Sequence, residues 1–148
     1  MPLRVLLADR DSKFLELVGA HLARERIAAS QASTGLECLA RLRAFGPDVL
    51  VLDPNLLWGG GRGVLAAMSE DPDLAAIPVI LVCNQEDTGS FSKLEAPQVR
   101  EYLTKPLSPT ALTRAIRKVA ASSKKLVLAD SSVWLGSESV DAGRRPRG

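Results

Sequence analysis

The sequence has few of the residues that build disulfide frameworks, zinc sites and thiol enzymes. It contains two cysteines and one histidine in 148 residues. Cys38 and Cys83 lie inside apolar patterns rather than at disulfide or zinc-site spacings, which favours a reducing compartment. His21 would have to reach Cys83 from a different segment to activate a thiol. These shortages disfavour a disulfide-stapled fold and a cysteine-nucleophile enzyme.

Long apolar runs and an excess of one charge are also missing. No run approaches the roughly 20 apolar residues of a membrane span, and the N-terminus lacks the apolar core of a secretion signal, so the sequence predicts a cytoplasmic protein. Residues 1–123 carry 14 basic and 14 acidic side chains, whereas residues 124–148 carry five and three. The net charge of +2 therefore lies in the C-terminal segment. A neutral body argues against a nucleic-acid surface, which would need a basic face.

The sequence instead contains short apolar runs that alternate with amphipathic segments. Residues 49–52 are four consecutive aliphatic residues between turn signals, a pattern typical of a strand buried on both faces of a parallel sheet. Strands are predicted at 3–8, 27–32, 49–52, 77–84 and 99–104. Helices are predicted at about 12–25, 35–45, 63–70, up to about 95, and 109–123. Five strands alternating with five helices predict right-handed crossovers and one parallel sheet.

Local signals define the predicted helix starts. Asp11 or Ser12 is expected to cap the first helix, and Ser108 the last. Thr34 and Glu37 form a Thr-x-x-Glu capping box, in which each side chain accepts a hydrogen bond from a backbone N–H of the other residue. The helix that follows this box is expected to bury Leu36, Leu39 and Leu42.

Two segments fall outside the alternation. Residues 56–63 are too rich in glycine to be expected to hold one rigid shape. Residues 124–148 follow a domain of residues 1–123 and are expected to form a flexible C-terminal tail.

Three charged side chains are expected to meet at one edge of the sheet. Asp9 follows the first predicted strand, Asp53 the third and Lys105 the fifth. The carboxyl ends of parallel strands lie at the same edge, which is where open α/β sheets bind their ligands. Two carboxylates and one amine would form a pocket that can carry a phosphate.

These features resemble the receiver domain of bacterial two-component response regulators over residues 3 to about 121. The motifs are the buried strand that ends at Asp53, the strand that begins Ile77-Pro78-Val79-Ile80, and Tyr102-Leu103-Thr104-Lys105-Pro106-Leu107, which is similar to the family's aromatic-x-x-Lys-Pro-hydrophobic signature. The resemblance implies a doubly wound, flavodoxin-like α/β fold: a five-stranded parallel sheet of strand order 2-1-3-4-5 with helices on both faces. It also implies a stand-alone receiver module, not an enzyme, over residues 1–123.

The resemblance implies a phosphorylation site with a metal ion. Asp53 would be the phosphoacceptor, and Asp9, Asp53 and Asn55 would hold Mg²⁺, which prefers oxygen ligands. A divalent cation would offset the crowding of negative oxygens during phosphoryl transfer.

The resemblance also implies a switch and a set of partners. Lys105, Cys83 and Asn84 would contact the phosphoryl group. Cys83 and Tyr102 would couple the site to the signalling face of helix four, strand five and helix five. The implied partners are a histidine kinase or phosphotransfer protein and an unknown downstream protein, without direct nucleic-acid or membrane binding, and a homodimer is left open.

Two positions of the expected site depart from the family. Arg10 follows Asp9 where a second acid is usual, so a cation replaces the acid expected to bind the metal directly and weakens the Mg²⁺ site. Cys83 stands where Ser or Thr is usual, and a thiol is a weak hydrogen-bond donor. Asp11 is expected to cap the first helix rather than to replace the missing acid.

Two hypotheses follow within the family, and one lies outside it. In the first, Asp53 is phosphorylated slowly or with weak metal dependence. In the second, Arg10 forms an ion pair with Asp53 or Asp9 in place of the metal, and the chain is a pseudo-receiver that binds partners without phosphate. The remote alternative is dinucleotide binding, because residues 61–66, from Gly61 to Ala66, match Gly-x-Gly-x-x-Ala, although they lie eight residues past a strand end.

Overall fold

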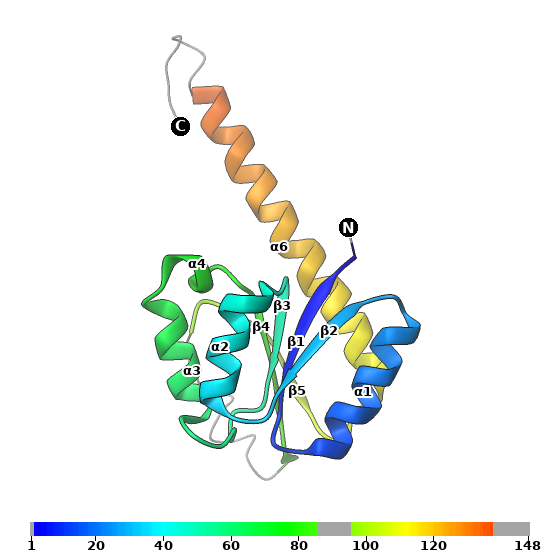
Figure 1. Cartoon of the computed structure of the whole chain (residues 1–148). Helices are drawn as coiled ribbons and strands as arrows, with labels where there is room; N and C mark the ends of the chain where they lie inside the picture. The colour runs from blue at the N-terminus through cyan, green and yellow to red at the C-terminus, as the bar shows by residue number, and fades with distance from the viewer. Residues whose placement is uncertain (1, 86–95, 138–148) are drawn as a thin grey trace.

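Five parallel strands form one sheet at the centre of the molecule (Figure 1). The computed structural model describes residues 2–85 and 96–137. The strand order is β2-β1-β3-β4-β5, and every neighbouring pair is parallel, which confirms the predicted topology. The strands are β1 (Arg4–Ala8), β2 (Ala28–Ala32), β3 (Val49–Leu52), β4 (Val79–Cys83) and β5 (Val99–Thr104).

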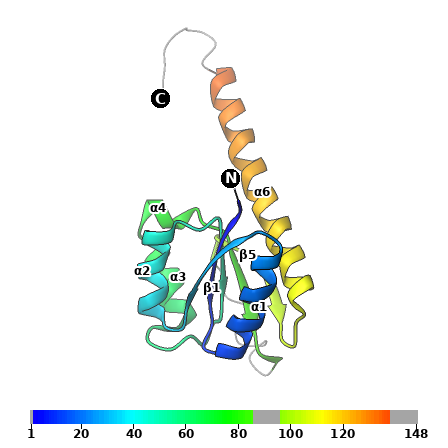
Figure 2. The ribbon, with the colours of Figure 1, turned by 45° about the vertical axis from the view of Figure 1, so that its right-hand side comes forward.

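Helices cover both faces of this sheet, as predicted (Figures 1 and 2). Alternate residues of the strands point into two separate apolar clusters, one on each face. The helices α1 (Ser12–Arg24) and α6 (Pro109–Ser137) pack on one face. The helices α2 (Gly35–Phe45) and α3 (Gly60–Ser69) pack on the other, and the short α4 (Pro72–Ala75) follows α3. The helix expected up to about residue 95 lies outside the described residues.

The first turn of α2 differs from the expectation. Leu36 is 72% exposed, so the prediction that it is buried was wrong, and Cys38 takes the inward position between Gly35 and Leu42. The Thr34 cap sets the phase of the helix, and its inner face then runs through residues three and four apart. Burial raises the pKa of the Cys38 thiol to about 12, so Cys38 stays protonated and acts as a core residue.

The capping box at the start of α2 forms in only one direction. The Thr34 hydroxyl accepts a hydrogen bond from the Glu37 N–H at 3.1 Å, as predicted. The Glu37 carboxylate accepts from the N–H of Ser33 at 2.8 Å, one residue before the cap. The expected return bond to Thr34 is therefore displaced by one residue. The Ser33 hydrogen bond also lowers the pKa of Glu37.

The glycine-rich connection after β3 has one defined path. Helix α3 begins at Gly60, three residues earlier than expected, and Gly59 and Gly60 have φ angles of 108° and 63°. The Gly61 N–H donates to the Pro54 carbonyl at 2.8 Å, and a Cβ on Gly61 would lie 2.7 Å from the Pro54 Cα. The second half of the stretch expected to be an irregular loop, residues 60–63, therefore belongs to a helix. The close packing on Pro54 accounts for Gly61 without a bound pyrophosphate.

The last helix is longer than predicted. Its first turns place Leu112, Ile116 and Val119 in the core, as predicted, but α6 continues to Ser137 instead of ending near Ser123. No proline or glycine interrupts residues 110–135, so the backbone meets no helix breaker. In Figure 1, α6 extends well past the sheet. Within the described ranges, no helix is both long and apolar enough to cross a membrane.

Candidate functional site

Two buried carboxylates lie side by side at the carboxyl edge of the sheet. Asp9 follows β1, and its N–H donates to the Ala32 carbonyl of β2 at 3.0 Å. Asp53 follows β3, and its N–H donates to the Ala8 carbonyl at 2.8 Å. These bonds extend the sheet ladder and fix both backbones. The Asp9 and Asp53 residues are only 2% and 3% exposed.

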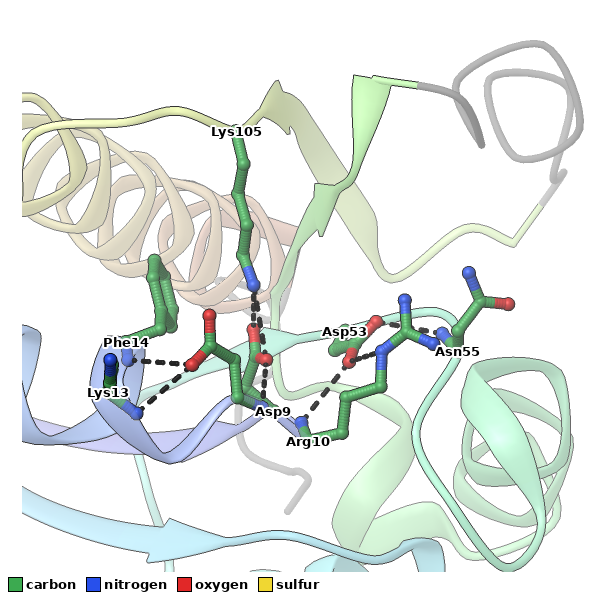
Figure 3. A network of polar contacts seen from close by, with 8 residues as sticks. Asp9, Arg10, Lys13, Phe14, Asp53, Asn55 and Lys105 are labelled. Carbon is green, nitrogen blue, oxygen red and sulfur yellow. Dashed lines mark hydrogen bonds and ion pairs between the residues drawn. The ribbon is translucent and has the colours of Figure 1, made fainter.

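Arg10 and two backbone amides hold the Asp53 carboxylate (Figure 3). The Arg10 Nε lies 3.1 Å from Oδ2 of Asp53, and the Arg10 backbone N–H donates to the same oxygen at 3.2 Å. The Asn55 N–H donates to Oδ1 at 2.9 Å. Both oxygens of the Asp53 carboxylate therefore have a partner. The positively charged partner is Arg10, which stands where a second acid was expected after β1.

Lys105 is paired with Asp9. Its Nζ lies 3.0 Å from Oδ2 and 3.2 Å from Oδ1 of Asp9. The ammonium also lies 4.3 Å from the centre of the Phe14 ring on α1, at the distance of a cation–π contact. The Lys105 N–H donates to the Cys83 carbonyl at 2.8 Å, which ties the end of β5 to β4, and the Lys105–Pro106 peptide bond is cis.

Burial raises the pKa of Asp9 above its usual value. The hydrogen bond from the Asp11 N–H, at 2.8 Å, opposes this effect, the nearby Asp53 charge adds to it, and Lys105 opposes it. The rise means that the low polarity around Asp9 outweighs its favourable contacts.

Asp11 is used as a helix cap, as expected. Its Oδ1 accepts hydrogen bonds from the N–H groups of Lys13 and Phe14 at 3.0 and 3.3 Å. Asp11 therefore does not replace the acid that Arg10 displaces.

The charged groups at this edge do not fit a bound divalent ion. Two carboxylates, Asp9 and Asp53, face two cations, Lys105 and Arg10, so the formal charges cancel. In the part of the chain that the structure describes, no group of three or more His, Cys, Asp or Glu residues could hold a metal ion. Mg²⁺ is usually held by one or two carboxylates together with phosphate oxygens and water, and here each of the two carboxylates is already paired with a cation.

The other residues expected at the site are spread along the same edge. Asn55 is half-buried, and its side-chain amide points away from the Asp53 carboxylate (Figure 3). Cys83 is buried at the end of β4, and Asn84 follows it and is half-buried. Tyr102 lies on β5 with 43% of its surface exposed.

Sequence reasoning missed two features next to the site. Phe14 was assigned no role at the site, although an aromatic residue in the first turn after a strand-end acid could have indicated a contact with Lys105. The second feature is exposed apolar surface on the β3–α3 connection and on the first turn of α2. A tryptophan among glycines, at Trp58, was the available signal.

Comparisons with known proteins agree on one family. The family model described as "Response regulator receiver domain" matches residues 5–117. Protein PilH of Pseudomonas aeruginosa is 28% identical over 120 residues, which cover 80% of this chain and 98% of PilH. Response regulator PleD of Caulobacter vibrioides is 27% identical over 119 residues, and the match spans 80% of this chain but only 26% of PleD.

A solved structure supports the same fold. The chemotaxis response regulator CheY4 of Vibrio cholerae is 20% identical, with a TM-score of 0.73 over 80% of this chain and 99% of CheY4. The likeness at this identity concerns the arrangement of strands and helices.

Proposed function

The chain belongs to the response regulator receiver domain family, and from this premise we propose that Asp53 accepts a phosphoryl group from a histidine-containing donor protein. Receiver domains are generally signalling modules without an enzyme activity of their own. Their family implies a histidine kinase or phosphotransfer protein as the donor.

The gathering of Asp9, Asp53 and Lys105 at one edge of the sheet supports this proposal. Asp53 is fixed at the end of a central strand, and its carboxylate is held by two N–H groups and one guanidinium. In the transfer, the bond from phosphorus to the donor's imidazole nitrogen breaks while a bond forms from phosphorus to an Asp53 oxygen. The imidazole nitrogen keeps the electron pair and takes up a proton.

Arg10 gives this acceptor a fixed positive charge. Receiver domains typically bind Mg²⁺ at the phosphorylation site, where the cation offsets the charge of the phosphoryl oxygens. Here the guanidinium already lies 3.1 Å from the acceptor oxygen, and Lys105 supplies a second positive charge on the neighbouring Asp9. We therefore propose that phosphorylation of Asp53 depends only weakly on a divalent ion.

Incubation with acetyl phosphate tests the proposal by intact mass. We expect an adduct of about 80 daltons, the mass of one phosphoryl group, at similar rates in Mg²⁺ and in EDTA. Asp53→Asn should abolish the adduct. Arg10→Ala should slow labelling in EDTA about 100-fold, as loss of one preorganised charge donor does, whereas Arg10→Asp should make labelling depend on Mg²⁺.

The contact between Arg10 and Asp53 also favours a second candidate function. The Asp53 side chain is only 4% exposed, and the guanidinium covers the oxygen that would attack. A chain with its acceptor permanently paired would be a pseudo-receiver that binds its partner without phosphate. Absence of any adduct in both Mg²⁺ and EDTA, with the protein folded, would reject phosphorylation and favour this candidate.

Several finer assignments remain predictions. These are the phosphoryl contacts of Cys83 and Asn84, the switch role of Cys83 and Tyr102, a cytoplasmic location and the absence of nucleic-acid binding. Signalling through the face of the fourth predicted helix, the fifth strand and the fifth predicted helix is a further one.

A further inference from the structure

Three large apolar side chains are exposed on two segments that contact each other, the first turn of α2 and the β3–α3 connection. Leu36 on the first turn of α2 is 72% exposed, and Leu57 and Trp58 on the β3–α3 connection are 56% and 73% exposed. We call these three residues the tryptophan patch. Tryptophan is among the residues that most often dominate binding energies at protein interfaces.

Backbone contacts hold the two segments of the tryptophan patch together. Thr34 and Leu57 form a parallel β-bridge, and the Gly35 N–H donates to the Leu57 carbonyl at 2.6 Å. A Cβ on Gly35 would collide with the Trp58 carbonyl, so only glycine permits this approach. The exposed side chains are therefore presented by a fixed scaffold.

The backbone at Trp58 is in an uncommon conformation. Its φ angle is 55°, a left-handed value that bulky residues rarely adopt, and Gly59 and Gly60 follow with positive φ as well. Such outliers persist when the surrounding structure imposes them, and they concentrate at functional sites. At this position the largest apolar side chain of the loop is exposed to solvent.

The place of the tryptophan patch identifies its occupant. The loop that carries Leu57 and Trp58 leaves the sheet directly after Asp53, and the Leu56 N–H donates to the Asp53 carbonyl at 3.2 Å. A protein that delivers a phosphoryl group to the nearly buried Asp53 must bring its histidine over this edge and thereby cover the loop. Arg10 and Lys105, both at the same edge, match the negative charge of the incoming phosphoryl group.

We propose that the tryptophan patch is the docking surface for the phosphohistidine-bearing segment of the donor protein, with apolar donor side chains beside the histidine resting on Trp58 and Leu57. This inference rests on the proposed function. A second copy of the chain is a poorer occupant, because a stable interface buries about 800 Å² per partner and one aromatic residue contributes only about 150–250 Å². A small apolar contact suits a partner that must leave after transfer.

The test compares a protein donor with a small-molecule donor on the full chain. Purified, autophosphorylated histidine kinases of the source organism are screened, and the one that labels the chain fastest is used. Trp58→Ala and Leu36→Ala should each slow transfer from this kinase about 10- to 30-fold, as loss of an interface hot spot does. Labelling by acetyl phosphate should change less than about twofold for both variants. Arg43→Ala, at the opposite end of α2, is the matched control and should leave both rates unchanged.

The possible failures of the two proposals differ. Absence of labelling of the unchanged chain by acetyl phosphate would defeat the proposed function. Normal acetyl phosphate labelling with unchanged kinase transfer in both patch variants would overturn the docking surface. Equal slowing with both donors would also overturn it, because the residues would then act on the acceptor itself. The docking surface would also be overturned if acetyl phosphate labels the chain but none of the kinases does.

Discussion

At the scale of single residues, the Asp9 carboxylate lies in surroundings that oppose its own charge. It is 2% exposed, and burial is the largest cause of its raised pKa. The folded protein therefore binds a proton at Asp9 more readily than the unfolded chain does. Between the usual Asp pKa of 3.8 and the raised folded pKa, protonation favours the folded state.

The variant Asp9→Asn should therefore be more stable than the unchanged chain at pH 7. The neutral amide removes the burial penalty of a charge, which is fully present above the folded pKa. The stability advantage of the variant should decrease as pH falls through the folded pKa of Asp9 and become independent of pH below 3.8, where the carboxyl is protonated in both states. Urea unfolding between pH 7 and pH 4 measures it. If the variant is less stable at pH 7, the ion pair between Asp9 and Lys105 stabilises the fold by more than the burial of the Asp9 charge destabilises it.

Individual residues of the site were predictable to different degrees. The shared edge of Asp9, Asp53 and Lys105 followed from strand order, because each residue comes directly after a parallel strand. The partner of each cation could not be read from the sequence. Arg10 and Lys105 both have long side chains, and only the packing of Phe14 beside Lys105 and the path of the β1–α1 loop assign one cation to each carboxylate.

At the scale of elements, the β3–α3 connection requires a residue without a side chain at Gly61. Gly61 is buried at the start of α3, where its N–H reaches the Pro54 carbonyl. Gly63 lies two residues later in the same helix, and nothing lies within 4 Å of the position of its Cβ. The two glycines thus offer a matched pair for the same substitution.

Gly61→Ala and Gly63→Ala should change stability in opposite directions. The first forces a methyl group against the Pro54 backbone and should lower the free energy of unfolding by about 1–3 kcal/mol, a usual cost of overpacking. The second adds a better helix former in open space and should raise it by about 0.5–1 kcal/mol. Chemical denaturation of both variants measures the changes. Equal effects would show that the approach of Gly61 to Pro54 is not a constraint.

Elements with a clear pattern of hydrophobic residues were predictable. Elements whose bounds depend on tertiary packing were not. The four aliphatic residues of β3 could be assigned to a buried strand because no polar residue interrupts them. The glycine run gave no period, so neither the start of α3 at Gly60 nor the exposed Trp58 could be derived. The prediction for Leu36 was wrong because the sequence does not show which side of the first turn faces the core. The Thr34 cap decides this.

At the scale of the whole molecule, the described part of the apolar core ends before the last helix leaves the sheet (Figure 1). Val119 and Ala120 are 4% and 7% exposed and belong to the cluster that α1 and α6 form with the sheet. The side chains described beyond them in α6, from Ala121 to Ser123, are exposed or half-buried. The independently folding unit should therefore end near residue 123.

A chain that ends at Ser123 should unfold like the full chain. We expect the free energy of unfolding to change by less than about 0.5 kcal/mol, the usual range for surface changes. A chain that ends at Lys118 loses the burial of Val119 and should be at least about 1.5 kcal/mol less stable. Urea titration of the three proteins compares them. A large loss on ending at Ser123 would place part of the core in the following segment.

The architecture as a whole was the most predictable level. Alternating strands and helices, with two strands apolar throughout, leave few arrangements other than a parallel sheet covered on both faces. The full length of α6 and the four-residue α4 were not predicted. A helix of four residues shows no period, and the end of α6 carries no strong stop signal before Gly136.

The straight continuation of α6 makes the helix a lever. Residues 124–137 add 14 residues of helix beyond the unit that we expect to fold alone, which is about 21 Å at 1.5 Å per residue. A tilt of about 10° at the base of the helix would move its far end by about 4 Å, a displacement of the size seen in interface rearrangements. A small repacking of the sheet against α6 would thus be magnified at a distance from the carboxylates.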